Sequence, residues 1–133
     1  KFTSHNLFLM EEIVNRPEGP QVFNGSDEIF LAGVTMGAQA GIGSFYNILP
    51  RHFVGIHRAV GENDLGSGRK LQREVNQVIR ICQGYGGLAA LRTILAWQGV
   101  DCGNPVPPTR PLDEEEKTSL RRELGASGVS ILE

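Results

Sequence analysis

Three short clusters of polar and reactive side chains follow segments of the chain that have the pattern of strands or strand ends. They are residues 1–4 (Lys-Phe-Thr-Ser), 25–28 (Gly-Ser-Asp-Glu) and 43–47 (Gly-Ser-Phe-Tyr-Asn). Together they offer an amine, two carboxylates, several hydroxyls and glycines that let a ligand approach the backbone. Because α/β folds bind ligands at the carboxyl ends of parallel strands, we expect the three clusters to form one site.

Lys1 is the residue with the most specific possible chemistry. Burial disfavours the charged form of a lysine, and the neutral amine attacks a ketone to form a Schiff base. The resulting iminium is an electron sink for breaking or making the adjacent carbon–carbon bond. Composition and spacing also allow a solvated terminal lysine at this position, and they allow Asp27 and Glu28 to be ordinary acids at a helix start.

Other chemistries find little support in the sequence. The run 41–44 (Gly-Ile-Gly-Ser) lacks the full GxGxxG or GxxxxGK[ST] pattern of a nucleotide site. Cys82 and Cys102 have no CxxC spacing, so we expect no metal and two idle thiols in a reducing compartment, the cytoplasm. The three histidines are interpreted as structural or surface residues, with His5 nearest the expected site.

Composition excludes further classes of function. The chain has 133 residues, with 13 Lys and Arg against 15 Asp and Glu and a net charge of −2. This balance gives no electrostatic reason to expect nucleic acid or an anionic membrane surface as a partner. No apolar run approaches the roughly 20 residues that a membrane helix needs. The chain begins with Lys rather than Met, so we expect residue 1 not to be a translation start.

The elements that must position the clusters alternate between helix and strand. We expect a helix between Ser4 and Pro17, a strand over 21–24, a helix over 29–36 and a strand over 41–44, followed by helices over 49–60, 64–82, 88–98 and 113–124. Such alternation implies parallel strands joined by crossovers. Two short strands and a stub ending at Lys1 make only part of a parallel sheet, so the chain is expected to be about half of a larger enzyme.

Three motifs stand in a fixed order along nearly the whole chain: Lys-x-Thr-Ser at 1–4, Phe-Asn-Gly-Ser-Asp-Glu-Ile-Phe at 23–30, and Gly-Ala-x-x-Gly-Ile-Gly-Ser-x-Tyr-Asn at 37–47. The helical continuation with Lys-Leu-Gln at 70–72 also fits. In this order they resemble the C-terminal half of the N-acetylneuraminate lyase subgroup of the pyruvate-dependent class I aldolases. The broader superfamily includes dihydrodipicolinate synthase.

The resemblance implies a fold and an assembly. The fold is α/β, the C-terminal portion of a (β/α)8 barrel from the end of strand six to strand eight, with additional C-terminal helices. Residues 1–60 would hold the last βα units, and residues 61–133 a helical extension of the same domain. The implied partners are the missing N-terminal half of the barrel and further copies in a homotetramer.

The resemblance also implies a reaction, the reversible cleavage of N-acetylneuraminate to N-acetylmannosamine and pyruvate. Lys1 matches the lysine that forms the covalent Schiff base with pyruvate, so neither cofactor nor metal is implied. The positions that match substrate contacts are Thr3, Gly25, Asp27, Glu28, Gly43 and Ser44. The family's proton-handling tyrosine and carboxylate-binding loop belong to the N-terminal half, so this chain alone is expected to be inactive.

Two differences from the synthase branch favour a lyase. That branch has Lys-Asp-Ser at the first cluster and lacks the paired Asp27 and Glu28. One departure from the lyases is Phe45, where they typically carry a small hydroxyl residue; it either faces the barrel wall or reshapes the pocket. The alternatives are a sister enzyme, either an aldolase for 2-keto-3-deoxy sugar acids or a synthase-like enzyme, and a non-catalytic interaction module.

Overall fold

The computed structural model describes residues 1–131, which form two compact units. The first unit is Lys1–Val75 and the second begins at Asn76. All of the predicted site residues lie in the first unit.

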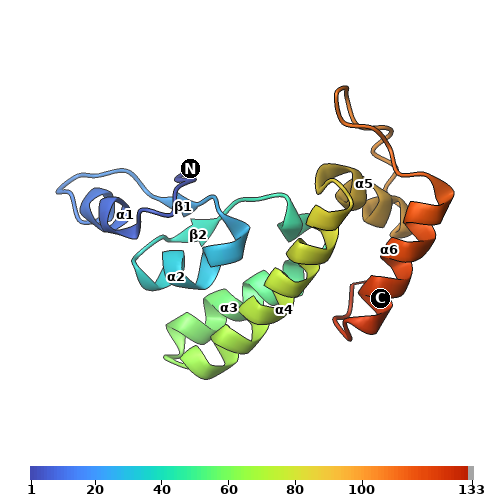
Figure 1. The fold of residues 1–133 in the computed structure, drawn as a ribbon. Coiled ribbons are helices and arrows are strands. Elements are labelled where there is room, and N and C mark those ends of the chain that lie inside the picture. Colours follow the sequence, from blue (N-terminus) through green and yellow to red (C-terminus); the bar gives the residue numbers. More distant parts are fainter. Residues whose placement is uncertain (132–133) are drawn as a thin grey trace. The chain divides into compact units, whose positions relative to one another are not determined.

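The first unit alternates helix with strand in the order that the sequence pattern predicts (Figure 1). Its elements are α1 (Leu7–Val14), β1 (Phe23–Asn24), α2 (Phe30–Thr35), β2 (Ala40–Gly41), α3 (Pro50–Gly61) and the start of α4 (Leu65–Gly84). Short 3-10 turns at Asp27–Ile29 and Phe45–Asn47 follow the two strands.

The strands are parallel, as predicted. β1 pairs with β2 in a register that places Phe23 opposite Ala40 and Asn24 opposite Gly41. Phe2 adds a third parallel segment, because it bridges to Asn24 and its N–H donates a 2.8 Å hydrogen bond to the carbonyl of Phe23. The carboxyl ends of all three segments therefore lie at one edge of the sheet.

The strands are shorter than the sequence predicts. The expected strand over 41–44 is wrong in extent, because β2 ends at Gly41 and the last ladder bond is a 2.9 Å hydrogen bond from the N–H of Ile42 to the carbonyl of Asn24. The expected buried strand over 21–24 shortens to two residues, and the side chain of Phe23 is 39% exposed. The shortening leaves Gly43 and Ser44 in the turn after the strand.

α1 buries the face that its sequence predicts. The side chain of Asn6 caps the helix by accepting a 3.1 Å hydrogen bond from the N–H of Leu9. The core beneath the helix consists of buried side chains and apolar neighbours around them: Met10, Val22 and Ala38, with Phe2, Leu7, Ile13, Val14 and Met36. This core fixes the segment that follows Lys1 against β1.

An aromatic cluster joins α2, the second 3-10 turn and α3. The rings of Tyr46 and Phe53 are stacked with centroids 3.7 Å apart, and Phe30 meets them edge-on at 5.5 and 5.6 Å. Phe30 and Phe53 are buried, so the cluster forms the core on this side of the unit.

α4 begins where the sequence predicts. Asp64 accepts a 3.0 Å hydrogen bond from the N–H of Ser67, two residues into the helix. This bond and its neighbours hold the pKa of Asp64 below its ordinary value, because they stabilise the charged carboxylate.

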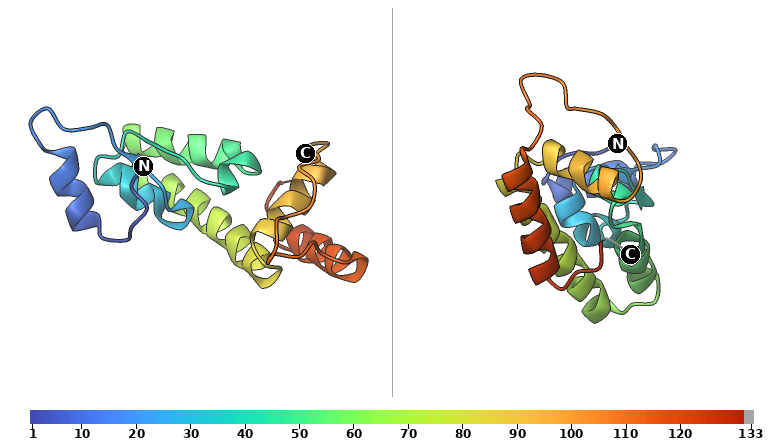
Figure 2. Two further views of the ribbon diagram at one scale, coloured as in Figure 1. Left: turned by 90° about the horizontal axis from the view of Figure 1, so that it is seen from above. Right: turned by 90° about the vertical axis from the view of Figure 1, so that its right-hand side faces the viewer.

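The second unit contains the remainder of α4 together with α5 (Leu88–Trp97) and α6 (Glu114–Ala126). α5 and α6 contact one another (Figure 2). The guanidinium of Arg121 lies 5.3 Å from the ring of Trp97. The proline-rich segment between the two expected helices is loop and extends away from both of them in Figure 1. None of the helices within residues 1–131 has the length and apolar character needed to cross a membrane.

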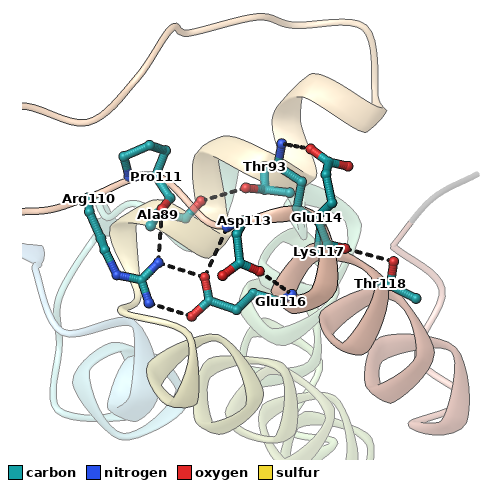
Figure 3. A network of polar contacts seen from close by, with 9 residues as sticks. All are labelled: Ala89, Thr93, Arg110, Pro111, Asp113, Glu114, Glu116, Lys117 and Thr118. Atoms are coloured by element: carbon teal, nitrogen blue, oxygen red, sulfur yellow. Dashed lines mark hydrogen bonds and ion pairs between the residues drawn. The ribbon is translucent and has the colours of Figure 1, made fainter.

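The acidic run at the start of α6, the helix expected over 113–124, forms a helix cap. Asp113 and Glu116 form a capping box: Asp113 Oδ1 accepts from the N–H of Glu116 at 2.9 Å and Glu116 Oε2 accepts from the N–H of Asp113 at 3.0 Å. Arg110 donates two further hydrogen bonds of 2.6 and 2.7 Å to the Glu116 carboxylate (Figure 3). The hydrogen bonds from Arg110 and from the N–H of Asp113 lower the pKa of Glu116 to about 2.

Candidate active site at the carboxyl ends of the strands

The predicted clusters lie at or directly after the three parallel segments, and the first cluster includes the bridging residue Phe2 itself. We call the segments that contain these clusters the first turn (residues 1–6), the second turn (residues 25–28) and the third turn (residues 42–47). Their contacts decide whether the clusters form one site.

The first and second turns meet at Gly25. The N–H of Gly25 donates a 2.7 Å hydrogen bond to the carbonyl of Phe2. A Cβ atom added at Gly25 would lie 2.7 Å from Cε of Lys1 and would overlap the Thr3 hydroxyl. Only glycine at this position lets the side chains of Lys1 and Thr3 lie across the second turn.

The second and third turns meet through Asp27. Its Oδ2 accepts a 2.9 Å hydrogen bond from the N–H of Phe45. A Cβ atom added at Gly43 would overlap the same carboxylate. Asp27 therefore points toward the third turn, and Gly43 is the residue that makes room for it.

Burial controls the electrostatics of Asp27. The residue is only 7% exposed, and Oδ1 has no hydrogen-bond partner within residues 1–131. Burial raises the pKa of Asp27 above its ordinary value; the charge of Glu28 raises it further, whereas the Phe45 N–H and the charge of Lys1 oppose the shift. Asp27 is therefore a buried carboxylate whose charge is only partly compensated by its neighbours.

Glu28 behaves differently from its neighbour. Its side chain is 44% exposed, and Oε1 lies 3.0 Å from Nε2 of His5 in the first turn. The sequence placed His5 near the site but assigned it no partner there. The spacing of 23 residues between the two carries no local signal that could have revealed the contact.

A buried glutamine on α4 supports the second turn. Gln72 Oε1 accepts a 2.8 Å hydrogen bond from the N–H of Leu31, and Nε2 donates a 3.1 Å bond to the carbonyl of Asp27. In the sequence, Gln72 stands out only as part of the Lys-Leu-Gln run at 70–72. An amide among the apolar positions of a helix was the available signal, since buried polar side chains need partners.

The remaining predicted residues are placed as follows. Lys1 and Thr3 are exposed, so the described residues do not provide the burial that the Schiff-base argument expects for a reactive lysine. Ser44 is exposed in the third turn. Phe45 is half-buried, and its backbone N–H donates a hydrogen bond to Asp27. The structure therefore brings the three turns into contact and leaves Lys1, Thr3 and Ser44 open on their outer side.

Two hollows contain none of the predicted site residues, although Tyr46 of the third turn lines the first of them. One is apolar, lies between β2 and α3, and is lined by Phe30, Ala40, Gly41, Tyr46, Phe53 and Val54 among others. The other lies in the second unit, with Arg92, Trp97, Pro111 and Lys117 in its wall. Among residues 1–131, no group of three or more His, Cys, Asp or Glu side chains is placed to hold a metal ion.

Comparison with known proteins gives one family and a set of similar chains. The profile of the Dihydrodipicolinate synthetase family matches residues 1–127. The chain is 38% identical over 125 residues to the N-acetylneuraminate lyase of Salmonella agona (strain SL483), a match that covers 91% of this chain and 41% of that protein. The chain thus spans about two fifths of the length of the curated relatives it matches.

Two solved structures share the fold. The Proteus mirabilis N-acetylneuraminate lyase superposes with a TM-score of 0.87 at 27% identity, over 96% of this chain and 44% of that one. A variant of the Sulfolobus solfataricus 2-keto-3-deoxygluconate aldolase, in complex with L-2-keto, 3-deoxy-galactonate, superposes with a TM-score of 0.84 at 26% identity, over 94% of this chain and 43% of that one.

Proposed function

The chain belongs to the dihydrodipicolinate synthetase family, as its motifs indicated, and we propose that the polypeptide carrying it is a Schiff-base lyase that cleaves N-acetylneuraminate reversibly to N-acetylmannosamine and pyruvate. The observation that carries the proposal is the packing of Lys1 and Thr3 across Gly25, beside the acid pair, at the common edge of three parallel segments. This edge is where α/β enzymes bind their substrates.

Each predicted residue has a role in the proposal. Lys1 is the nucleophile. The hydroxyls of Thr3 and Ser44 contact the substrate, and Gly25 and Gly43 let it approach the backbone. Glu28 binds hydroxyls of the sugar acid, while Asp27 supports the third turn and lies beside the same substrate.

The proposed reaction requires only the substrate, water, Lys1 and a base. The neutral amine of Lys1 attacks the C2 ketone of the open-chain sugar acid, and loss of water gives an iminium. A base takes the proton of the C4 hydroxyl, the C3–C4 bond breaks, and its electron pair moves into the iminium to form an enamine. N-acetylmannosamine leaves. The enamine is protonated at C3, and water hydrolyses the imine to pyruvate and free Lys1. The iminium is the electron sink, so the proposal includes neither cofactor nor metal.

The proposal extends to the rest of the fold. Residues 1–60 are the last βα units of a (β/α)8 barrel and residues 61–133 are its helical extension. We propose that further βα units of the barrel complete the pocket around Lys1, which is exposed among the described residues. We propose that the chain by itself is inactive and that the intact protein is a homotetramer. The free thiols of Cys82 and Cys102 fit a reducing compartment such as the cytoplasm.

A sister aldolase is the second candidate. The observations that favour it are the structural similarity to a 2-keto-3-deoxygluconate aldolase and the presence of Phe45 in the third turn. A pyruvate-release assay over a panel of sugar acids separates the two. Turnover of N-acetylneuraminate above the other substrates supports the lyase, and turnover of a 2-keto-3-deoxy sugar acid alone supports the sister enzyme. A protein that releases no pyruvate and forms no pyruvate adduct would instead be a non-catalytic module.

A further inference from the structure

The contact between His5 and Glu28 has no counterpart in the catalytic steps proposed above. Nε2 of His5 lies 3.0 Å from Oε1 of Glu28. A carboxylate oxygen only accepts hydrogen bonds, so Nε2 carries the proton and donates it. The two side chains are 69% and 44% exposed, which leaves the pair accessible at the outer side of the first and second turns.

The backbone around His5 is fixed on both sides. The carbonyl of His5 accepts a 3.0 Å hydrogen bond from the N–H of Leu7, at the start of α1. The hydroxyl of Ser4 accepts a 3.1 Å bond from the N–H of Asn6, and Asn6 caps the same helix. The imidazole is therefore presented from a constrained position only four residues beyond Lys1.

The two acids of the second turn are held by different neighbours. Asp27 is buried and bound to the backbone of Phe45, so its orientation is set by the third turn. Glu28 is partly exposed, and Nε2 of His5 contacts its carboxylate from the first turn. A long exposed carboxylate samples several rotamers, and a neighbour that restricts them lowers the entropy lost when a ligand binds.

We infer that His5 is a positioning residue that fixes the Glu28 carboxylate for the hydroxylated end of the substrate. This inference rests on the proposed function, because it names what tunes recognition at the same site. His5 acts on binding of the polyhydroxyl part and not on the bond-making step at Lys1. It therefore contributes to the preference for long sugar acids over short keto acids.

The test uses the intact natural polypeptide with His5→Ala, His5→Gln and, as a matched control, His57→Ala. His57 binds the backbone carbonyl of Gln39 and lies outside the three turns. Steady-state kinetics are measured with N-acetylneuraminate and with a 2-keto acid that lacks the terminal hydroxyls, and trapping of pyruvate by borohydride is measured in parallel. Circular dichroism checks that each variant folds.

For His5→Ala we expect KM for the long substrate to rise about 3- to 10-fold with kcat nearly unchanged, as expected when one side chain must be ordered on binding. KM for the short acid and the pyruvate adduct should stay at wild-type values. His5→Gln should restore most of the loss, because its amide can donate to Glu28. In a Glu28→Ala background, His5→Ala should have no further effect.

An unchanged KM in His5→Ala, or an equal rise for both substrates, would overturn the inference, as would failure of His5→Gln to recover. If the wild-type protein forms the pyruvate adduct but His5→Ala leaves KM for the long substrate unchanged, only this inference fails. If the wild-type protein forms no adduct at all, the proposed function fails and this inference fails with it.

Discussion

The backbone N–H of Phe45 donates a 2.9 Å hydrogen bond to Oδ2 of Asp27, and this bond ties the turn after β2 to the turn after β1. The carboxylate is buried over Gly43, and its other oxygen has no partner within residues 1–131. The charged form is thus only partly compensated, which is why burial dominates and raises the pKa of Asp27. The two acids of the second turn therefore differ in environment: Asp27 is buried and bound to the third turn, whereas Glu28 is partly exposed.

The first prediction concerns the pH dependence of stability. Because the pKa of Asp27 is higher in the folded than in the unfolded state, the folded state binds more protons between those two values. The free energy of unfolding therefore falls as pH rises from about 4 through the folded-state pKa, relative to a variant that cannot titrate. In urea unfolding, the free energy of unfolding of Asp27→Asn should rise relative to that of the wild type as the pH increases from 3.5 to 7. If the free energies of unfolding of the wild type and Asp27→Asn changed equally with pH, burial would not raise the pKa of Asp27.

The second prediction separates the acids by function. Glu28→Ala should reduce kcat/KM for the sugar acid by about 10-fold or more, because it removes a hydrogen-bond acceptor with full charge, and it should leave the pyruvate adduct intact. Asp27→Ala should reduce both, because it releases Phe45 and loosens the third turn. The double variant should still lose more sugar-acid turnover than adduct formation. Equal loss of both in Glu28→Ala would mean that Glu28 supports the fold instead.

The third prediction concerns the close approach at Gly25. In Gly25→Ala, the new methyl group must displace Cε of Lys1 and the hydroxyl of Thr3. Both side chains are exposed and can turn away, so stability should change by less than about 0.5 kcal/mol. Adduct formation should nevertheless slow by about 10-fold or more, since a misplacement near 1 Å is costly for a reacting group.

Gly61→Ala is the matched control for Gly25→Ala. Gly61 ends α3, and a Cβ atom there meets nothing within 4 Å. The control should keep the wild-type rate of adduct formation. A Gly25→Ala protein with the rate of the control would show that the contact across Gly25 does not orient the amine.

Much of the fold follows from local pattern. The face of α1 that contains Leu7 and Met10 was predictable from helical spacing, and the start of α4 from the cap residue Asp64. The extent of β2 was not, because a two-residue strand has no alternation of its own. Its register is set by pairing with Phe23 and Asn24 on another segment.

The general location of the site was also predictable from the sequence, whereas the orientation of its side chains was not. Parallel strands place their carboxyl ends at one edge, so the meeting of the three turns at Gly25 and Asp27 was predictable from topology. The bond from Phe45 to Asp27 spans 18 residues and the bond from Gln72 to the Asp27 carbonyl spans 45. Orientation at such distances depends on packing between elements, which residue spacing does not encode.

The fourth prediction tests the capping box of α6. Asp113→Ala removes the side-chain acceptor for the N–H of Glu116, and it should lower the free energy of unfolding by about 1 kcal/mol. Glu115→Ala is the control, because Glu115 is exposed in the same first turn and should change stability by less than about 0.5 kcal/mol. Equal effects of the two substitutions in thermal or urea unfolding would contradict a specific role for the box.

The identity of Lys1 as the nucleophile is the central claim, and one measurement tests it directly. The intact protein is incubated with pyruvate and borohydride, digested, and examined by mass spectrometry for the modified peptide. If Lys1 is the nucleophile, we expect a reduced pyruvate adduct on its amine in the wild type and none in Lys1→Arg, because a guanidinium cannot act as the nucleophile. An adduct on a different lysine, or an adduct that persists in Lys1→Arg, would contradict it.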